Sequence, residues 1–263
     1  MFTPNEGREP NPTEAEIVAA IDAAMSARNQ AQPRRQYLGA SRIGEACERR
    51  LGYEYHQIPK DEGSSFTGKT LRIFDMGHDG EERMADYLRV AGFELITHKE
   101  DGKQIAIEDA AGRIKGHLDG VLISGPVKLP YPCLWENKAL GEKSWKDVVK
   151  HGLRKSKPVY FVQMQLYMGY HEVANGVFTA LNRDTGEIYV ELVPFDARAC
   201  QESIDKAVRV VSSGNPEELG RAGRGIDDFT CKFCDYKQTC WSRKLPTQST
   251  NTNTINPSWL RKE

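Results

Sequence analysis

The segment CLWENKAL, Cys133–Leu140, constrains the fold most, because it sets two charges inside an apolar strand pattern. Alternate side chains of a strand share a face, so Glu136 and Lys138 should project together, roughly 6–7 Å apart. By itself, a Glu and a Lys at this spacing are more typical of a solvent-exposed strand face. The flanking Leu, Trp, Ala and Leu instead favour a buried strand, where charges are costly unless they are paired or bind a metal.

A second carboxylate precedes this strand, because Asp119 lies in GHLDGVLI, the neighbouring predicted strand. Neighbouring strands lie roughly 5 Å apart, so Asp119 can stand beside Glu136. Paired Asp and Glu carboxylates suit Mg²⁺ or Mn²⁺, which take oxygen ligands. A lysine next to such a site can stabilise a metal-bound hydroxide or the negative charge that develops in phosphoryl transfer. The three side chains therefore predict phosphodiester hydrolysis.

The order of predicted elements favours one α/β domain with a central mixed sheet flanked by helices. Helices are expected over residues 15–29, 41–55, 71–91, 143–152, 158–173 and 196–212, the first behind a capping box of Thr13 and Glu16. Strands are expected in FELITHK, QIAIED, RIKGHLDGVLIS and CLWENKAL, followed by a hairpin of GVFTALN and EIYVELVPF. The domain should cover residues 13–245, between a flexible N-terminus, 1–12, and a flexible polar tail, 246–263.

Charge and composition limit the partners that the chain can have. Lys+Arg number 36 and Asp+Glu 37, so a nucleic-acid site must be a local basic patch rather than an overall field. No apolar run is long enough for a membrane span, and the start lacks the apolar core of a signal peptide, so a cytoplasmic location is expected. The candidate patches are Arg42, Arg49 and Arg50, and a run of Lys143, Lys146, Lys150, Arg154, Lys155 and Lys157 interleaved with Trp145, Tyr160 and Phe161.

Asp119 followed by Glu136-Asn137-Lys138 resembles the D…(D/E)-x-K core of the PD-(D/E)XK nuclease superfamily, although Leu118 replaces the proline of the named motif. Downstream, Gln163 and Tyr167 stand at i and i+4 on one helix face. By itself such a pair more often packs, but here it resembles the Q-x-x-x-Y motif of RecB-like nucleases, in which this helix supports the site and approaches DNA. The resemblance implies a restriction-endonuclease-like core. Asp119, Glu136 and the carbonyl of Asn137 would hold the metal, and Lys138 would position or activate the attacking water.

A further metal ligand is expected from the helix upstream of the strands, where relatives place a histidine or a glutamate. Glu81 shares a helical stripe with Phe74, Gly77 and Met84, which turns it inward and favours it. His78 lies one turn earlier and is the alternative ligand.

Three cysteines, Cys231, Cys234 and Cys240, follow C-x2-C-x5-C spacing near the end of the chain. Six cysteines in a reducing compartment indicate metal binding more than disulfides. The triplet and the segment around Cys47 resemble the RecB-like iron–sulfur nucleases, above all the CRISPR-associated RecB-like exonucleases and their phage homologues. In that family one early cysteine joins three late ones on a 4Fe–4S cluster. The resemblance thus implies a cluster-binding region that joins the N-terminal and C-terminal segments, with zinc as the alternative.

The remaining cysteines, Cys133 and Cys200, are expected to be buried as small apolar residues. The combined expectation is a DNA nuclease dependent on Mg²⁺ or Mn²⁺, an exonuclease more than an endonuclease. The alternative is a non-catalytic DNA-binding or assembly subunit. The chain has no helicase-type phosphate loop, so it would act on single strands or DNA ends, or with a helicase, recombinase or integration complex. The setting is a bacterial cytoplasm, or a host cytoplasm if the chain is phage-encoded.

Overall fold

The computed structural model describes residues 11–242, so the predicted tail, 246–263, and most of the predicted flexible N-terminus lie outside the described residues. Its helices are α1 (Pro12–Gln30), α2 (Ala40–Ile43), α3 (Glu48–Tyr55), α4 (Gly68–Val90), α5 (Glu142–His151), α6 (Leu153–Ser156), α7 (Pro158–Tyr170), α8 (Ala197–Ser212) and α9 (Lys237–Ser242), with short 3-10 turns η1 (Pro216–Glu218) and η2 (Phe229–Cys231). Its strands are β1 (Leu38–Gly39), β2 (Glu94–Ile96), β3 (Ala106–Asp109), β4 (Ile114–His117), β5 (Gly120–Ser124), β6 (Cys133–Leu140), β7 (Asn175–Asn182) and β8 (Ile188–Pro194). No helix in this described part is long and apolar enough to cross a membrane.

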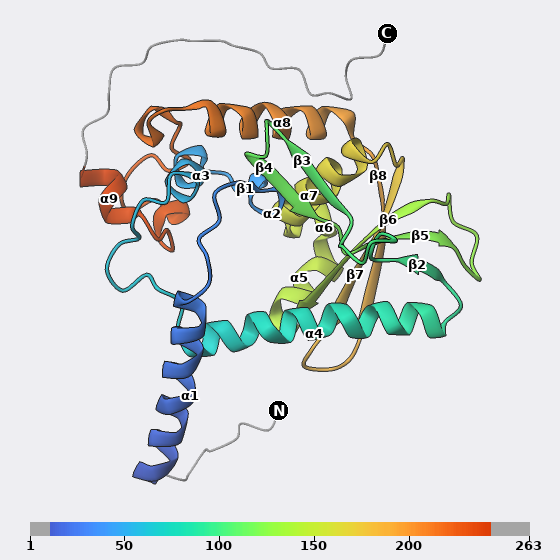
Figure 1. Ribbon diagram of the computed structural model, residues 1–263, viewed down its shortest axis with the longest axis horizontal. Helices are drawn as coiled ribbons and strands as arrows, with labels where there is room; N and C mark the ends of the chain where they lie inside the picture. The colour runs from blue at the N-terminus through green and yellow to red at the C-terminus, as the bar shows by residue number, and fades with distance from the viewer. Residues whose placement is uncertain (1–10, 243–263) are drawn as a thin grey trace.

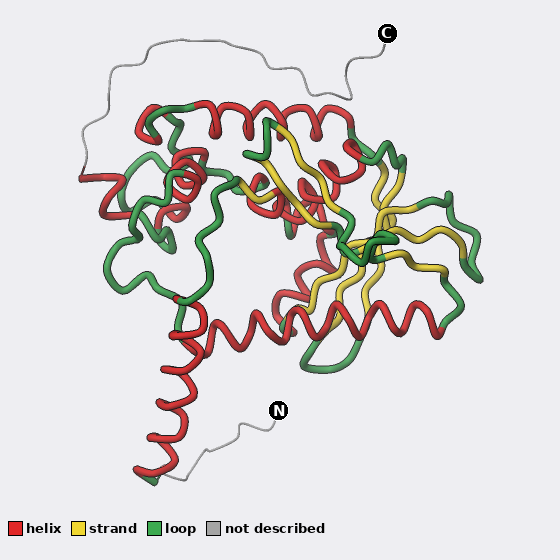
Figure 2. Tube along the Cα trace, in the orientation of Figure 1, coloured by secondary structure: helices red, strands yellow, loops and turns green. Residues whose placement is uncertain are grey.

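The main sheet has five strands in the order β2-β5-β6-β7-β8 (Figure 2). Strands β6 and β7 are parallel, and the other neighbours are antiparallel, so the predicted mixed sheet is confirmed. The parallel pair needs a crossover, which α5, α6 and α7 supply. Strand β6 lies in the centre, and most of it is buried.

Helices cover both faces of this sheet (Figure 1). One core lies between the sheet and α7, with α8 outside it, and includes Leu134, Tyr167 and Phe178. A second core lies between the other face and α4, and includes Met84 and Trp135. Because Leu134 and Trp135 are consecutive, they face opposite cores, as the alternation of a strand requires. The predicted α/β architecture with flanking helices is therefore confirmed.

The stretch RIKGHLDGVLIS, expected as one strand, is two strands that belong to different sheets. Strand β4 pairs with β1 and β3 in a small sheet, whereas β5 joins the main sheet. The chain bends at Leu118 and Asp119 between them. Gly116 allows the close packing before this joint, because a Cβ there would lie 2.6 Å from the Cβ of Ala40.

The helix expected over residues 41–55 is also interrupted. Helix α2 ends at Ile43, and α3 begins after Cys47, which is its N-cap. A Cβ on Gly44 would lie 2.4 Å from the Cα of Val159, so this turn packs directly against the backbone of α7. Because of this break, Cys47 lies at the N-cap of α3 with an extended backbone, rather than inside one continuous helix as expected.

Helix α1 begins earlier than expected and projects from the body of the molecule (Figure 1). Its capping box consists of Asn11 and Glu14, with Pro12 in the first turn, rather than Thr13 and Glu16. The helix has no buried residue and is joined to α4 by ion pairs of Asp22 with Arg72 and of Arg28 with Asp75. A connector, residues 31–37, leads from α1 to β1.

Candidate active site

The two charged residues of β6 lie together in the middle of this central strand. Glu136 is fully buried, and its Oε1 accepts hydrogen bonds from Lys138 Nζ and, over 2.7 Å, from Gln163 Nε2. Its other oxygen, Oε2, has no hydrogen-bond partner among residues 11–242. Burial raises the pKa of Glu136, and the nearby Asp119 carboxylate raises it further. This carboxylate is thus held in a site where negative charge is costly and one acceptor atom is left open.

Asp119 reaches the site from the joint between the two sheets. Its Oδ2 accepts a hydrogen bond of 2.8 Å from the backbone nitrogen of Asn137 and lies 3.6 Å from Lys138 Nζ. The Asp119 side chain is 10% exposed, so it stands at the rim of the site while Glu136 stands beneath. Strands β5 and β6 are neighbours, and Gly120 pairs with Trp135, so Asp119, the residue before Gly120, comes next to Glu136 as the strand pattern predicted.

Lys138 is the cation of the site. Its Nζ donates to Glu136, donates over 2.8 Å to the carbonyl of Asn137, and lies 5.4 Å from the ring centre of Tyr160. Burial alone would lower the pKa of Lys138, but Asp119 and Glu136 outweigh burial and raise it. The two carboxylates thus favour the ammonium form of this side chain, which can supply positive charge and donate hydrogen bonds.

Helix α4 brings Glu81 to the same place. Gly80 allows the approach, because a Cβ there would lie only 2.7 Å from the Cβ of Ala139 on β6. Glu81 is half-buried, and its pKa is raised by burial and then by the charge of Asp119. His78 is exposed and makes no hydrogen bond or ion pair within the described part of the chain. Of the two candidate ligands, Glu81 is the one that lies close enough to Asp119 for its charge to raise the pKa.

The Gln163 and Tyr167 pair lies on α7 and faces β6. Gln163 binds Glu136 directly, whereas Tyr167 is 1% exposed and packs against Gly116, just before the Asp119 joint. Burial, with Glu136 and Asp119 nearby, raises the pKa of Tyr167 and keeps its phenol neutral. Both side chains thus brace elements that carry carboxylates.

Thr179 on β7 belongs to the site although its sequence position did not suggest it. Its hydroxyl accepts from Trp135 Nε1 over 3.0 Å and donates to Asn137 Oδ1 over 2.9 Å. The amide of Asn137 in turn donates to the carbonyl of Gly80 over 3.3 Å. This chain of bonds links β7, β6 and α4 behind the carboxylates. Thr179 reaches the site because the parallel register of β6 and β7 pairs it with Asn137. No local pattern in the sequence predicts that register.

A divalent metal fits the donor set of this site. Within residues 11–242 no three His, Cys, Asp or Glu side chains are already arranged to hold a metal ion. The residues nevertheless suit a hard cation, because the Asp119 carboxylate raises the pKa of both Glu81 and Glu136, and Glu136 Oε2 has no partner within residues 11–242. The carbonyl of Asn137, the fourth expected ligand, accepts from Lys138 in this structure.

The four cysteines of the predicted cluster line one cavity of about 260 Å³, here called the cysteine cavity. Cys47 comes from the start of α3, and Cys231, Cys234 and Cys240 come from the end of the described chain. Burial raises the pKa of Cys234, and Cys47 and Cys231 lie close enough to raise it further. Four thiols around an open space are a donor set for an iron–sulfur cluster or zinc. Cys133 and Cys200 are fully buried elsewhere, as expected.

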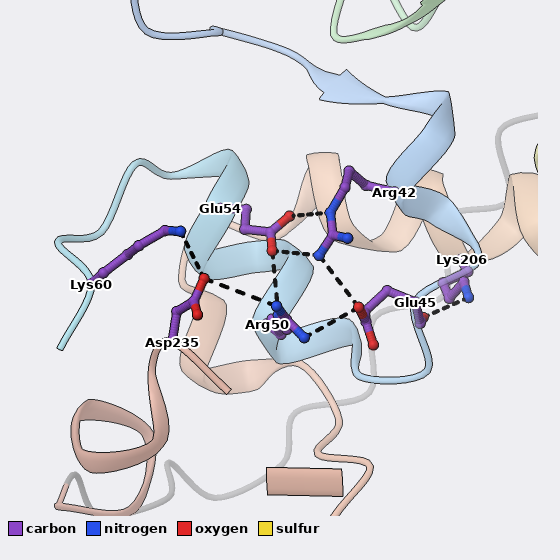
Figure 3. Close-up of polar contacts among 7 residues, drawn as sticks. All are labelled: Arg42, Glu45, Arg50, Glu54, Lys60, Lys206 and Asp235. Atoms are coloured by element: carbon purple, nitrogen blue, oxygen red, sulfur yellow. Dashed lines mark hydrogen bonds and ion pairs between the residues drawn. The ribbon is translucent and has the colours of Figure 1, made fainter. Parts of the chain in front are cut away.

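A network of ion pairs stands beside the cysteine cavity and joins its two chain segments (Figure 3). Arg50 lies 3.2 Å from Glu45, 3.4 Å from Glu54 and 3.9 Å from Asp235, the residue after Cys234. Lys60 reaches Asp235 over 2.7 Å, Arg42 reaches Glu54 over 2.7 Å, and Lys206 donates to the carbonyl of Glu45 over 3.0 Å. The network therefore joins segments on both sides of Cys47 to the cysteine triplet.

Six of the nine basic residues expected to contact DNA pair with other groups of the protein. Arg49 is 2% exposed and donates to the carbonyls of Glu217 and Leu219, and Arg42 and Arg50 belong to the network above. In the basic run, three cations pair with carboxylates, and Trp145 and Phe161 are buried. The pairs are Lys146 with Glu142, Arg154 with Asp196, and Lys157 with Asp147.

No protein-family model matches the chain, and no curated protein matches it in sequence. Among solved structures, an alkaline exonuclease from Laribacter hongkongensis, LHK-Exo, has 15% identity and a TM-score of 0.48 over 74% of this chain and 91% of that chain. A structure of LHK-Exo in complex with dAMP has 15% identity and a TM-score of 0.46 over the same shares. The protein SSO0001 has 14% identity and a TM-score of 0.48 over 85% of this chain and 96% of that chain.

Proposed function

We propose that this chain is a metal-dependent DNA nuclease, an exonuclease more than an endonuclease, that hydrolyses phosphodiester bonds. The observation that carries the proposal is the buried Glu136, whose Oε2 has no partner within residues 11–242 while Asp119 and Lys138 stand beside it. A buried carboxylate oxygen without a hydrogen-bond partner lowers the stability of the fold unless a cation binds it. A residue that served only in packing or on the surface would not need such an oxygen.

Asp119, Glu136, Glu81 and the carbonyl of Asn137 are the proposed holders of Mg²⁺ or Mn²⁺. The metal, when bound, would polarise a phosphoryl oxygen and lower the pKa of a bound water. The protein's own contribution is to keep these oxygens converged, through the Asn137–Asp119 hydrogen bond and the Gln163–Glu136 hydrogen bond. Such positioning lowers the entropic part of the activation barrier, because the reacting groups are already held in place.

Lys138 acts as a fixed positive charge. Because its pKa is raised by Asp119 and Glu136, it remains an ammonium and can donate hydrogen bonds to a phosphate oxygen or to the attacking water. It would therefore position or activate the attacking water and offset the charge that develops on the phosphorus oxygens.

Digestion of end-labelled single-stranded and double-stranded DNA with Mn²⁺ tests the activity and its mode. Glu136→Gln and Lys138→Gln should remain folded and cut at least about 100-fold more slowly. Glu202→Gln, an exposed change on α8, is the matched control. Covalently closed circular DNA should resist an exonuclease. Parental rates in both site variants would exclude this mechanism. A parent protein that binds DNA without cutting it with any metal would instead indicate a non-catalytic subunit.

The proposed cofactor of the cysteine cavity is a 4Fe–4S cluster held by Cys47, Cys231, Cys234 and Cys240. Support comes from the four thiols that line one cavity and from the two distant segments that they join. A site of this kind would stabilise the fold by fixing its two ends together. A helicase, recombinase or integration complex is the proposed kind of partner, since DNA ends or single strands must be supplied.

Anaerobic purification followed by absorbance and metal analysis tests the cluster. A band near roughly 400 nm with bound iron is expected of the cluster, whereas zinc without the band would support the alternative. Cys47→Ser should lose the metal as completely as Cys234→Ser, and Cys133→Ala should keep it. Full metal content in Cys47→Ser would show that the fourth ligand is wrong.

A further inference from the structure

A large groove lies between the end of α1, the connector 31–37 and the loop that follows α3. Its volume is about 850 Å³, and its lining is rich in basic, amide and aromatic side chains. The cations on it are Arg34, Arg35, Arg42 and Lys60, and Glu54 is the only carboxylate among the described residues that line it. Four cations with a single carboxylate in the described lining, next to aromatic rings, are suited to a chain of phosphates carrying flat rings.

The connector supplies the two cations of the groove that are available to bind phosphate. Arg34 and Arg35 are exposed, and neither has a carboxylate within ion-pair distance in the part of the chain that the structure describes. Arg42 and Lys60 on the opposite wall are already held by Glu54 and Asp235 (Figure 3). Arg42 and Lys60 are therefore neutralised by carboxylates, while the guanidinium groups of the connector have no carboxylate partner within residues 11–242. Guanidinium groups are well matched to phosphate oxygens.

Aromatic rings stand next to these cations. Phe66 is 43% exposed, with Lys60 Nζ 4.3 Å from its ring centre and the ring of Phe74 packed edge-on behind it at 5.1 Å. Tyr37 is half-buried between the guanidinium of Arg35 and the amine of Lys115, each 6.0 Å from its ring centre. Exposed rings held from behind can stack on bases, which requires bases that are not already paired and stacked in a duplex.

The pairing of β1 with β4 limits the distance between the groove and the carboxylate site. Gly39 lines the groove and pairs with Lys115 on β4, and Asp119 comes four residues after Lys115, past the end of β4. Four residues span at most about 14 Å, and paired strands are about 5 Å apart. The groove wall is thus within about 19 Å of the site, roughly six nucleotides at 3.4 Å each.

We propose that this groove binds single-stranded DNA, with Arg34 and Arg35 on phosphates and Phe66 stacked on a base, and feeds the strand to the carboxylate site. The inference rests on the proposed nuclease function and adds the strand preference and the path of the substrate.

Fluorescence anisotropy of the full chain with labelled oligo(dT) of about twenty nucleotides, in buffer without divalent metal, tests the groove. Arg34→Ala with Arg35→Ala should weaken binding about tenfold at about 0.15 M salt and reduce the slope of log K against log salt by about 1.4. Phe66→Leu, which keeps an apolar side chain but no ring, should weaken binding about fivefold or more without changing the slope. Lys150→Ala with Lys155→Ala, two exposed lysines of the basic run, is the matched comparison.

Parental affinity in the Arg34/Arg35 double variant, or a loss seen in the Lys150/Lys155 variant instead, would overturn the proposal. Tighter binding of a duplex of the same length, with the same dependence on Arg34 and Arg35, would overturn the single-strand preference. Because binding is measured without metal, the result does not depend on hydrolysis. A parent protein that binds through the groove but never cuts DNA would contradict the nuclease function and would still support single-strand binding in the groove.

Discussion

The backbone nitrogen of Asn137 donates a hydrogen bond of 2.8 Å to Asp119 Oδ2 and so ties the joint between the two sheets to the central strand. Asp119 follows β4 of the small sheet, and Asn137 lies between Glu136 and Lys138 in the main sheet. This hydrogen bond adds to the pairing of Gly120 with Trp135 in holding Asp119 next to Glu136. The geometry of the site depends on how the two sheets meet, as well as on the strand that carries the motif.

Asp119→Asn should separate this structural role from the chemical one. The amide keeps an oxygen that can accept from Asn137, so the melting temperature should change by only a few degrees. It removes a negative charge from the site, so the nuclease rate should fall about 100- to 1,000-fold. Cleavage of end-labelled DNA and thermal unfolding measure the two effects. Asp86→Asn, with an exposed side chain on α4, is the control, and equal rates in all three proteins would contradict the assignment.

Two glycines of α4 should respond oppositely to the same substitution. A Cβ on Gly77 meets nothing within 4 Å, so Gly77→Ala should stabilise the fold by about 0.5–1 kcal/mol through the helix backbone. A Cβ on Gly80 would lie 2.7 Å from the Cβ of Ala139, so Gly80→Ala should destabilise by about 1–3 kcal/mol and displace the adjacent Glu81. Urea unfolding and nuclease assays measure both. Equal stability changes would show that α4 does not pack closely on β6.

Features with a local period were predictable from the sequence. The alternation in CLWENKAL placed Glu136 and Lys138 on one face of a buried strand, and helical spacing placed Gln163 and Tyr167 on one face of α7. Both follow from backbone geometry that any chain shares. The mixed α/β architecture also followed from the order of elements.

Features that depend on distant contacts were not predictable in this way. The bend at Asp119 divides a stretch that reads as one strand, because each half pairs with different partners. The break before Cys47 depends on Gly44 meeting the backbone of Val159. Thr179 joins the site only through the register of β6 and β7. The cations of the connector are linked to a possible binding surface only by the groove that they line.

His171 should make the stability of the fold depend on pH. It is half-buried, its Nε2 has no partner within residues 11–242, and burial, with Lys99 nearby, lowers its pKa. The unfolded chain therefore binds more protons below the ordinary pKa of about 6.5, so this contribution to stability is lost as pH falls through that value. Urea unfolding between about pH 8 and 5 should show a smaller decline in His171→Gln than in the parent. Parallel curves would contradict the pKa shift.

Thr179 should prove to be a positioning residue for the carboxylate site. Thr179→Val fills the same volume but leaves Trp135 Nε1 and Asn137 Oδ1 without their partner, both in the buried interior. Two unsatisfied buried groups should cost about 2–4 kcal/mol of unfolding free energy. The nuclease rate should fall about ten- to a hundredfold, because Asn137 holds Asp119 and lies between Glu136 and Lys138.

The conservative variant separates the hydroxyl from the packing. Thr179→Ser keeps both hydrogen bonds and loses one methyl group, so it should cost about 1 kcal/mol and retain most of the activity. The measurements are urea unfolding and single-turnover cleavage with saturating Mn²⁺, compared at a temperature where all variants are folded. If Thr179→Val and Thr179→Ser lose the same activity, the bridge between Trp135 and Asn137 does not position the site, and Thr179 contributes only packing.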